Sequence, residues 1–205
     1  MIIDFGEVMK KRIFGMVMTA VMVVMAALSI NVADVFAEAD LKEARFCSFV
    51  VPPQFTPGGE KGLFINKEYP MESSSITYSV YYNGQDAVLT NREKAVMAGN
   101  GEPKVTDKST DLTKEIYQET IAAAYNSEYG EDVGYSVSSF DKITVDGHPG
   151  YKIEATFQAA DQERVYQTVY MLLSKYRTFT ITFQRAEDDD CLDAFSECES
   201  TIHIQ

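Results

Sequence analysis

The alternation of apolar and polar side chains between Ile143 and Gln184 is the feature that most constrains the fold of this chain. In one stretch the apolar residues at every second position are Tyr151, Ile153, Ala155 and Phe157. A period of two is expected when one face of a β-strand is buried and the other is wet. The stretch Val165–Ser174 is apolar on both sides, which is typical of a central strand covered on both faces. A third strand, rich in β-branched and aromatic residues, follows around Phe179–Gln184. The pattern predicts an antiparallel meander.

Two amphipathic segments predict helices that cover this sheet. The first is Leu112–Tyr129, with Asp111 or Thr113 as N-cap and Gly130 as the left-handed stop. Its expected apolar stripe is Leu112, Ile116, Thr120 and Ala123, widened by Ile121 and Ala124. The second helix is Cys191–Thr201, with one apolar face made of Leu192, Phe195, Cys198 and Ile202.

The remaining segments supply further strands and turns. A turn is expected at Thr56–Gly59, and a phase shift near Ser138–Ser139 predicts a β-bulge. Strands are expected at Arg45–Val51, Leu63–Asn66, Ile76–Tyr82 and Tyr135–Val145. We predict an α+β fold, with an antiparallel sheet of about six strands and helices on both faces.

The N-terminal segment has the pattern of a secretory signal peptide. A basic stretch, Lys10–Arg12, precedes the uncharged apolar run Ile13–Ile30. Small residues then favour cleavage after Ala37, or alternatively after Ala39. We expect residues 1–37 to be a signal peptide and 38–205 a single exported domain with no membrane span. The alternative is an uncleaved N-terminal membrane anchor, since the run is at the short end for crossing a bilayer.

The chain is strongly acidic, with a net charge of −13. Removal of residues 1–37 takes away three basic and three acidic residues and leaves 15 basic and 28 acidic ones. An acidic surface repels both nucleic acids and anionic membranes. We therefore expect neither as a partner, and we expect a soluble extracytoplasmic monomer.

The residues that commonly carry catalysis are scarce. The two histidines are His148, which we interpret as a solvated turn residue, and His203, which flanks the last predicted helix. Ser139 and Lys142 match Ser-x-x-Lys, but the companion motifs of that enzyme class are missing. The acidic run Glu187–Asp190 lacks the spacing of a calcium loop and suits a helix N-terminus instead. We predict no catalytic, cofactor or metal residue and no cofactor.

All three cysteines lie in the part of the chain expected to be exported, where oxidation is permitted. Cys191 and Cys198 are separated along one predicted helix by about 10 Å, which is too far for a disulfide bond. A bond would therefore join Cys47 to one of them, with Cys198 favoured because it lies on the apolar face. Three buried free thiols are the alternative.

A long connection, Gln85–Thr110, shows no regular pattern. Connections of this length inside a compact domain are uncommon and often functional. We interpret it either as a contact surface or as a mobile decoration.

Four segments carry a resemblance to a known family: Phe46–Pro53, Ile143–Ile153, Thr178–Phe183 and the closing run Asp193–Ile202. They resemble the PsbP-like family, and more narrowly its small secreted members in Gram-positive bacteria. The resemblance spans roughly Arg45 to Gln205 and implies an α-β-α sandwich around an antiparallel sheet. It also implies a non-catalytic role through binding of other proteins, and it carries over no site residue.

Two classes of function follow. The favoured one is a non-enzymatic extracytoplasmic binding module that contacts an envelope or extracellular protein through a sheet edge or through Gln85–Thr110. The alternative is a cell-surface hydrolase based on carboxylates, or a protein that binds a small ligand or calcium.

Overall fold

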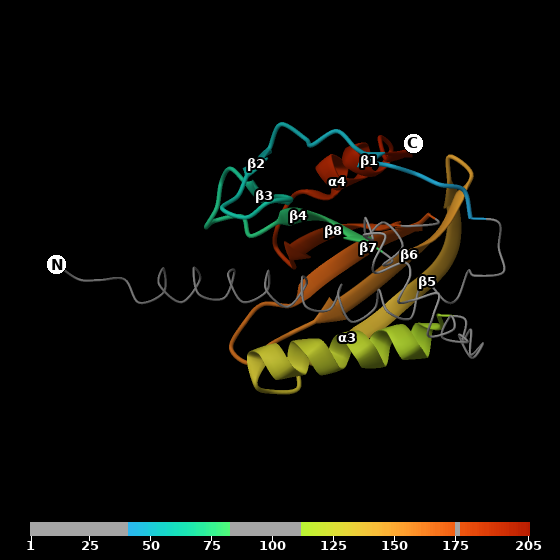
Figure 1. Cartoon of the computed structure of the whole chain (residues 1–205). Helices are drawn as coiled ribbons and strands as arrows, with labels where there is room; N and C mark the ends of the chain where they lie inside the picture. Colours follow the sequence, from blue (N-terminus) through green and yellow to red (C-terminus); the bar gives the residue numbers. More distant parts are fainter. Residues whose placement is uncertain (1–40, 83–111, 175–176) are drawn as a thin grey trace, which may run out of the picture.

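The computed structural model describes residues 41–82, 112–174 and 177–205 of the chain. Seven strands form one antiparallel sheet in the order β2-β3-β4-β8-β7-β6-β5 (Figure 1). They are β2 (Phe55–Pro57), β3 (Leu63–Asn66), β4 (Ser75–Tyr82), β5 (Ser136–Val145), β6 (His148–Phe157), β7 (Val165–Leu173) and β8 (Arg177–Ala186). A separate ribbon pairs β1 (Cys47–Ser48) with β9 (His203–Ile204). The α+β class with an antiparallel sheet is confirmed, with seven strands in the sheet instead of about six.

The predicted meander forms the longer half of this sheet. Strands β5 to β8 pair with their sequence neighbours, and β4 then pairs with β8. The predicted bulge is present, since the β5–β6 register shifts between Val137 and Ser139. As predicted, β7 is an interior strand that is apolar on both sides: Met171 and Leu172 are both buried but belong to different cores.

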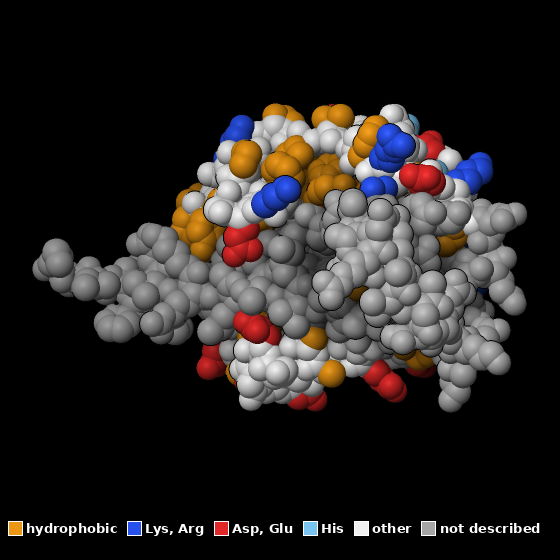
Figure 2. All heavy atoms as spheres, viewed as in Figure 1, with side chains coloured by type: hydrophobic (Ala, Val, Ile, Leu, Met, Phe, Trp, Pro, Cys, Tyr) orange, Lys and Arg blue, Asp and Glu red, His pale blue; other side chains and the backbone are white. Residues whose placement is uncertain are grey.

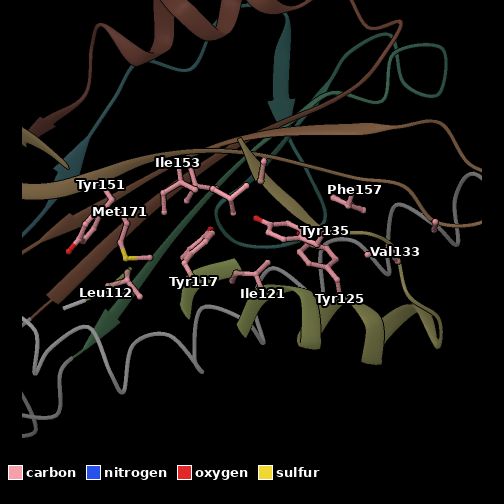
Figure 3. Close-up of a cluster of buried hydrophobic side chains, with 14 of the residues drawn as sticks. Leu112, Tyr117, Ile121, Tyr125, Val133, Tyr135, Tyr151, Ile153, Phe157 and Met171 are labelled. Atoms are coloured by element: carbon pink, nitrogen blue, oxygen red, sulfur yellow. The ribbon is translucent and has the colours of Figure 1, made fainter. Parts of the chain in front are cut away.

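The helix α3 (Lys114–Tyr129) packs on one face of the sheet. Its buried residues are Tyr117, Ile121 and Tyr125, which point toward the strands in Figure 3. They share a core with residues of β5, β6 and β7 that include Val137, Tyr151, Ile153, Ala155, Phe157, Val169 and Met171. The hydroxyl of Tyr125 also accepts a hydrogen bond of 2.8 Å from the side-chain nitrogen of Gln167.

The predicted ends of this helix are confirmed, but its predicted stripe is partly wrong. Thr113 is the N-cap, and Gly130 ends the helix with a φ of 71°. Ala123, however, is exposed, and Thr120 donates its hydroxyl hydrogen to the carbonyl of Ile116. Tyr117 and Tyr125, with Ile121 between them, bury far more apolar area than alanine does, so they decide which side of the helix faces the sheet.

The helix α4 (Leu192–Glu199) belongs to a second core, which is formed by the sheet side chains that point away from α3. In Figure 1, α4 and the β1–β9 ribbon lie across the sheet from α3. This core includes Ile76, Leu172, Phe179, Ile181, Phe183, Phe195, Cys198 and Ile204. Leu192 was predicted to be on the buried face of α4, but it is 59% exposed because it is the first residue of the helix.

The N-terminal part of the described chain is less regular than predicted. Of the strand expected over Arg45–Val51, Cys47–Ser48 is the part that forms a strand, β1, paired with β9. The turn predicted at Thr56–Gly59 is wrong in part, because Phe55–Pro57 pairs with β3. The predicted strands at β3 and β4 are confirmed.

Gly150 allows the close approach of β6 and β7, which leads to a first prediction. A Cβ atom at this position would collide with the backbone carbonyl oxygen of Met171. We expect Gly150→Ala to lower the free energy of unfolding by about 1–3 kcal/mol. The control is Gly59→Ala, where nothing lies within 4 Å of the added carbon. Equal midpoints for both variants in urea unfolding would contradict the close packing of these strands.

Candidate functional site

Three polar clusters and one sheet edge are the features of the described residues that are candidates for function. The first cluster centres on Asp189, in the acidic run that precedes α4. This buried carboxylate accepts hydrogen bonds from the backbone nitrogen and the hydroxyl of Ser73, at 2.9 and 3.0 Å, and from the backbone nitrogen of Ala186, at 2.7 Å. Asp189 therefore ties the β3–β4 connection to the end of β8.

The acidic run does not have the geometry of a calcium site. Asp189 faces the protein interior, whereas Asp188 and Asp190 are exposed. Within residues 41–82, 112–174 and 177–205, no group of three or more His, Cys, Asp or Glu residues is arranged to hold a metal ion.

The second cluster holds α4 against the sheet. The Lys152 ammonium of β6 lies 3.1 Å from the Glu199 carboxylate, which also accepts a 2.9 Å hydrogen bond from the Tyr170 hydroxyl. Burial alone lowers the pKa of Lys152, but its hydrogen bonds with Tyr170 and Glu199 outweigh this effect and raise it. The lysine thus stays charged at neutral pH and is unsuited to act as a base.

The third cluster links the β5–β6 hairpin to β9. The Asp146 carboxylate accepts hydrogen bonds from the Ile204 backbone nitrogen at 2.9 Å and contacts the His203 ring at 3.1 Å. These two partners, the backbone nitrogen first, lower the pKa of Asp146. His203, which was expected to flank the last helix, belongs to β9, the strand that follows α4.

The prediction for His148 is wrong. The hairpin loop contains only Asp146 and Gly147, so His148 already pairs with Val145 in the ladder. Its side chain is 5% exposed, and neither ring nitrogen has a hydrogen-bond partner. A buried imidazole in this position occupies space in the fold rather than serving as a solvent-facing base.

The cysteines are three buried free thiols, which is the alternative to the Cys47–Cys198 bond. All three lie in the core under α4. Burial raises the pKa of Cys47 and Cys198 to about 12 and that of Cys191 to about 11. They are therefore protonated at neutral pH and are poor nucleophiles.

The open edge of β5 is the fourth candidate. β5 stands at the end of the sheet order, and no described strand pairs with its outer side. At ten residues it is much longer than the other edge strand, β2, which has three residues and ends in Pro57. Proline and short length both limit pairing at the β2 edge.

The hairpin turn determines which groups of β5 face outward. Asp146 and Gly147 have φ values of 50° and 80°, as in a type I′ turn, which makes the flanking pair Val145 and His148 a hydrogen-bonded one. Such pairs alternate along an antiparallel ladder. The backbone N–H and C=O groups that point away from β6 are therefore those of Phe140, Lys142 and Thr144. The position of Pro149, which has no backbone N–H, agrees with this alternation. It lies opposite Thr144 in a pair that is not hydrogen-bonded, so β5 needs no N–H from this residue.

The other half of β5 is already occupied. The Val137 backbone nitrogen donates to the Gln118 side chain of α3 at 2.8 Å, and the bulge follows directly. The free edge is therefore a short segment from Phe140 to Val145. We call it the β5 edge.

Two other sequence predictions lie outside the described residues: the signal peptide at 1–37 and the contact surface at Gln85–Thr110. In the part that is described, neither α3 nor α4 is long and apolar enough to cross a membrane. Sequence reasoning named a sheet edge as a contact surface but did not identify the strand.

No protein-family model matches the sequence, and no curated protein matches it. Among solved structures, the fold is similar to the cyanobacterial PsbP of Synechocystis, with a TM-score of 0.47 and 15% identity over 78% of this chain and 86% of that one. It is also similar to LpqN of Mycobacterium tuberculosis, described as involved in cell envelope biogenesis, with a TM-score of 0.44 and 11% identity over 80% and 86% of the two chains. These are similarities of fold, and they bring no activity, ligand or partner to this chain.

The Asp189 cluster gives a second prediction. Asp189→Ala leaves the nitrogens of Ser73 and Ala186 without their acceptor, and we expect it to lower the free energy of unfolding by about 2–4 kcal/mol. Asp188→Ala, at the neighbouring exposed position, should change it by less than about 0.5 kcal/mol. Urea unfolding with and without added calcium measures both effects. A rise in stability with calcium that Asp189→Ala abolishes would show that the run binds metal.

Proposed function

We propose that this chain is an exported, non-enzymatic binding module that contacts another protein through the β5 edge. The observation that carries the proposal is the outer side of β5 between Phe140 and Val145, with which no strand among the described residues pairs. An open edge offers backbone donors and acceptors to an added strand, a common mode of peptide recognition.

Three carboxylates are held in hydrogen bonds within the protein, which supports a binding function rather than a catalytic one. Asp189, Glu199 and Asp146 each accept hydrogen bonds that join one element to another. A hydrolase based on carboxylates needs a pair of such groups free to act on a substrate. These three instead have structural partners.

The sequence supports binding outside the cytoplasm. The features of residues 1–37 are those of a secretory signal, and the resemblance of the chain is to small secreted PsbP-like proteins of Gram-positive bacteria. The partner would then be an envelope or extracellular protein, bound by a monomer of this chain.

Site-specific photo-crosslinking in the producing cells tests the proposal. A photoreactive amino acid replaces the exposed Lys142 on the β5 edge, or the exposed Lys61 between β2 and β3 as the control. We expect a defined adduct with one protein from position 142 and none from position 61, because only the first lies beside open backbone groups. The adduct should disappear when Thr144→Pro is added, since proline removes an outward N–H.

Two results would contradict the proposal. One is an identical set of adducts at both positions, and the other is no adduct from position 142 when the protein is present at its normal level in its own compartment.

A further inference from the structure

We infer that the buried ring of His148 makes the N-terminal run of the domain, residues 42–48, open in acid. We call this run the strap. At neutral pH the strap is closed over the end of the sheet, and below about pH 6.5 the binding of a proton to His148 favours its opening. The inference concerns the face of the sheet that carries α4, and it is independent of the β5 edge.

The strap crosses the second core close to the β5–β6 hairpin. Ala44 is 1% exposed and belongs to this core, and its carbonyl oxygen accepts a 2.8 Å hydrogen bond from the Arg177 guanidinium of β8. A Cβ atom at Gly147, in the hairpin turn, would lie 3.1 Å from the side-chain nitrogen of Lys42. In Figure 1 the blue run that leads into β1 passes this hairpin. The strap therefore covers the second core at the hairpin end of the sheet.

His148 is buried on the same face of the sheet. Its ladder partner is Val145, which packs against the second core, and directly paired residues of an antiparallel ladder share a face. His148 is 5% exposed, and no described residue forms a hydrogen bond with either ring nitrogen. Burying a charged group without partners is far more costly than burying a neutral one. The closed strap therefore favours the ring without its proton.

The elements around this ring offer an added positive charge little compensation. Their charged and titratable side chains are Lys42, Glu43 and Arg45 of the strap, Asp141 of β5, Asp146 of the turn, Lys152 of β6, Arg177 of β8, Glu199 of α4 and His203 of β9. Glu43 and Asp141 are exposed to water. Glu199 is held by Lys152 at 3.1 Å. Of the carboxylates on these elements, Asp146 is the one that acts on His148.

Asp146 is already engaged by the β1–β9 ribbon. Its Oδ2 atom accepts a hydrogen bond from the Ile204 backbone nitrogen and contacts the His203 ring. Both partners lower the pKa of Asp146 more than the charge of His148 does. An ordinary aspartate titrates near pH 3.9, so the contacts of Asp146 with the ribbon persist throughout the range from about pH 5 to about pH 7.5.

Proton linkage gives the direction of the effect. A histidine that meets water takes up its proton near pH 6.5. Below that pH the open strap therefore binds more protons than the closed strap, and acid shifts the equilibrium toward opening. We expect the open fraction to rise by at least about tenfold between about pH 7.5 and about pH 5. Opening separates β1 from β9 and exposes the Cys47 thiol, which the closed strap buries.

Amide hydrogen exchange of the protein at these two pH values, corrected for the intrinsic rates, tests the inference. The reporters are the backbone nitrogens of Arg45 and Gln205. The first donates to the carbonyl of Gln205 at 2.7 Å, and the second donates to the carbonyl of Phe46 at 3.0 Å, so both bonds join the strap to β9 and its end. We expect their protection to fall by at least about tenfold at the lower pH.

The two histidines of the chain provide matched variants. His148→Phe keeps a buried ring that takes up no proton, and we expect it to abolish the difference between the two pH values. His203→Gln removes the exposed histidine, whose protonation strengthens its contact with Asp146, so the difference should stay equal or become larger. If His148→Phe does not fold, NMR of the histidine rings in the unaltered protein replaces it. Protonation of His148 should then follow the loss of protection at Arg45 and Gln205.

Four results would overturn the inference. One is equal protection of the strap at both pH values, and another is a pH effect that His203→Gln removes and His148→Phe does not. A third is a His148 ring that is protonated at the lower pH while the strap keeps its protection. The last is exchange at Arg45 and Gln205 that urea accelerates as strongly as exchange in the β7–β8 ladder, because the strap would then open only with the whole fold.

Discussion

The alternation of side chains along β7 and β8 places two apolar cores back to back through one sheet. Met171 packs toward α3, while Leu172 and Phe179 pack toward α4. If one of these strands slipped by one residue, each of its side chains would turn to the opposite face of the sheet. The residues of each core would then no longer meet the helix that covers them. The positions of both helices therefore depend on this strand pair.

Covering both faces of the sheet in this way leaves its edges as the places where backbone groups can meet a partner. The β2 edge is short and ends in Pro57, and the first half of β5 is closed by Gln118 and the bulge. What remains is the segment from Phe140 to Val145. The polar clusters around Asp189, Glu199 and Asp146 complete this arrangement. They hold the β3–β4 connection, α4 and the β1–β9 ribbon in place, and the hydrogen bonds that do so are made within the protein.

The strands were predictable because their signal is local. A period of two over Tyr151–Phe157 and a two-sided apolar run over Val165–Ser174 need no knowledge of the rest of the chain. The stripe of α3 was harder to predict, because Tyr117 and Tyr125 carry polar hydroxyls on large apolar rings and their burial depends on partners such as Gln167. The identity of the edge strand depends on pairings between distant segments, such as β4 with β8, which no local pattern contains. The burial of His148 likewise depends on tertiary packing.

Amide hydrogen exchange along β5, resolved residue by residue, tests the open edge most directly. Amides bonded to β6 are protected by the sheet, whereas amides that point outward meet water. We expect Phe140, Lys142 and Thr144 to exchange at least on the order of tenfold faster than Asp141, Ile143 and Val145. Equal protection of all six amides in the isolated protein would show that the edge is already covered, and it would contradict the account of this strand as the contact surface.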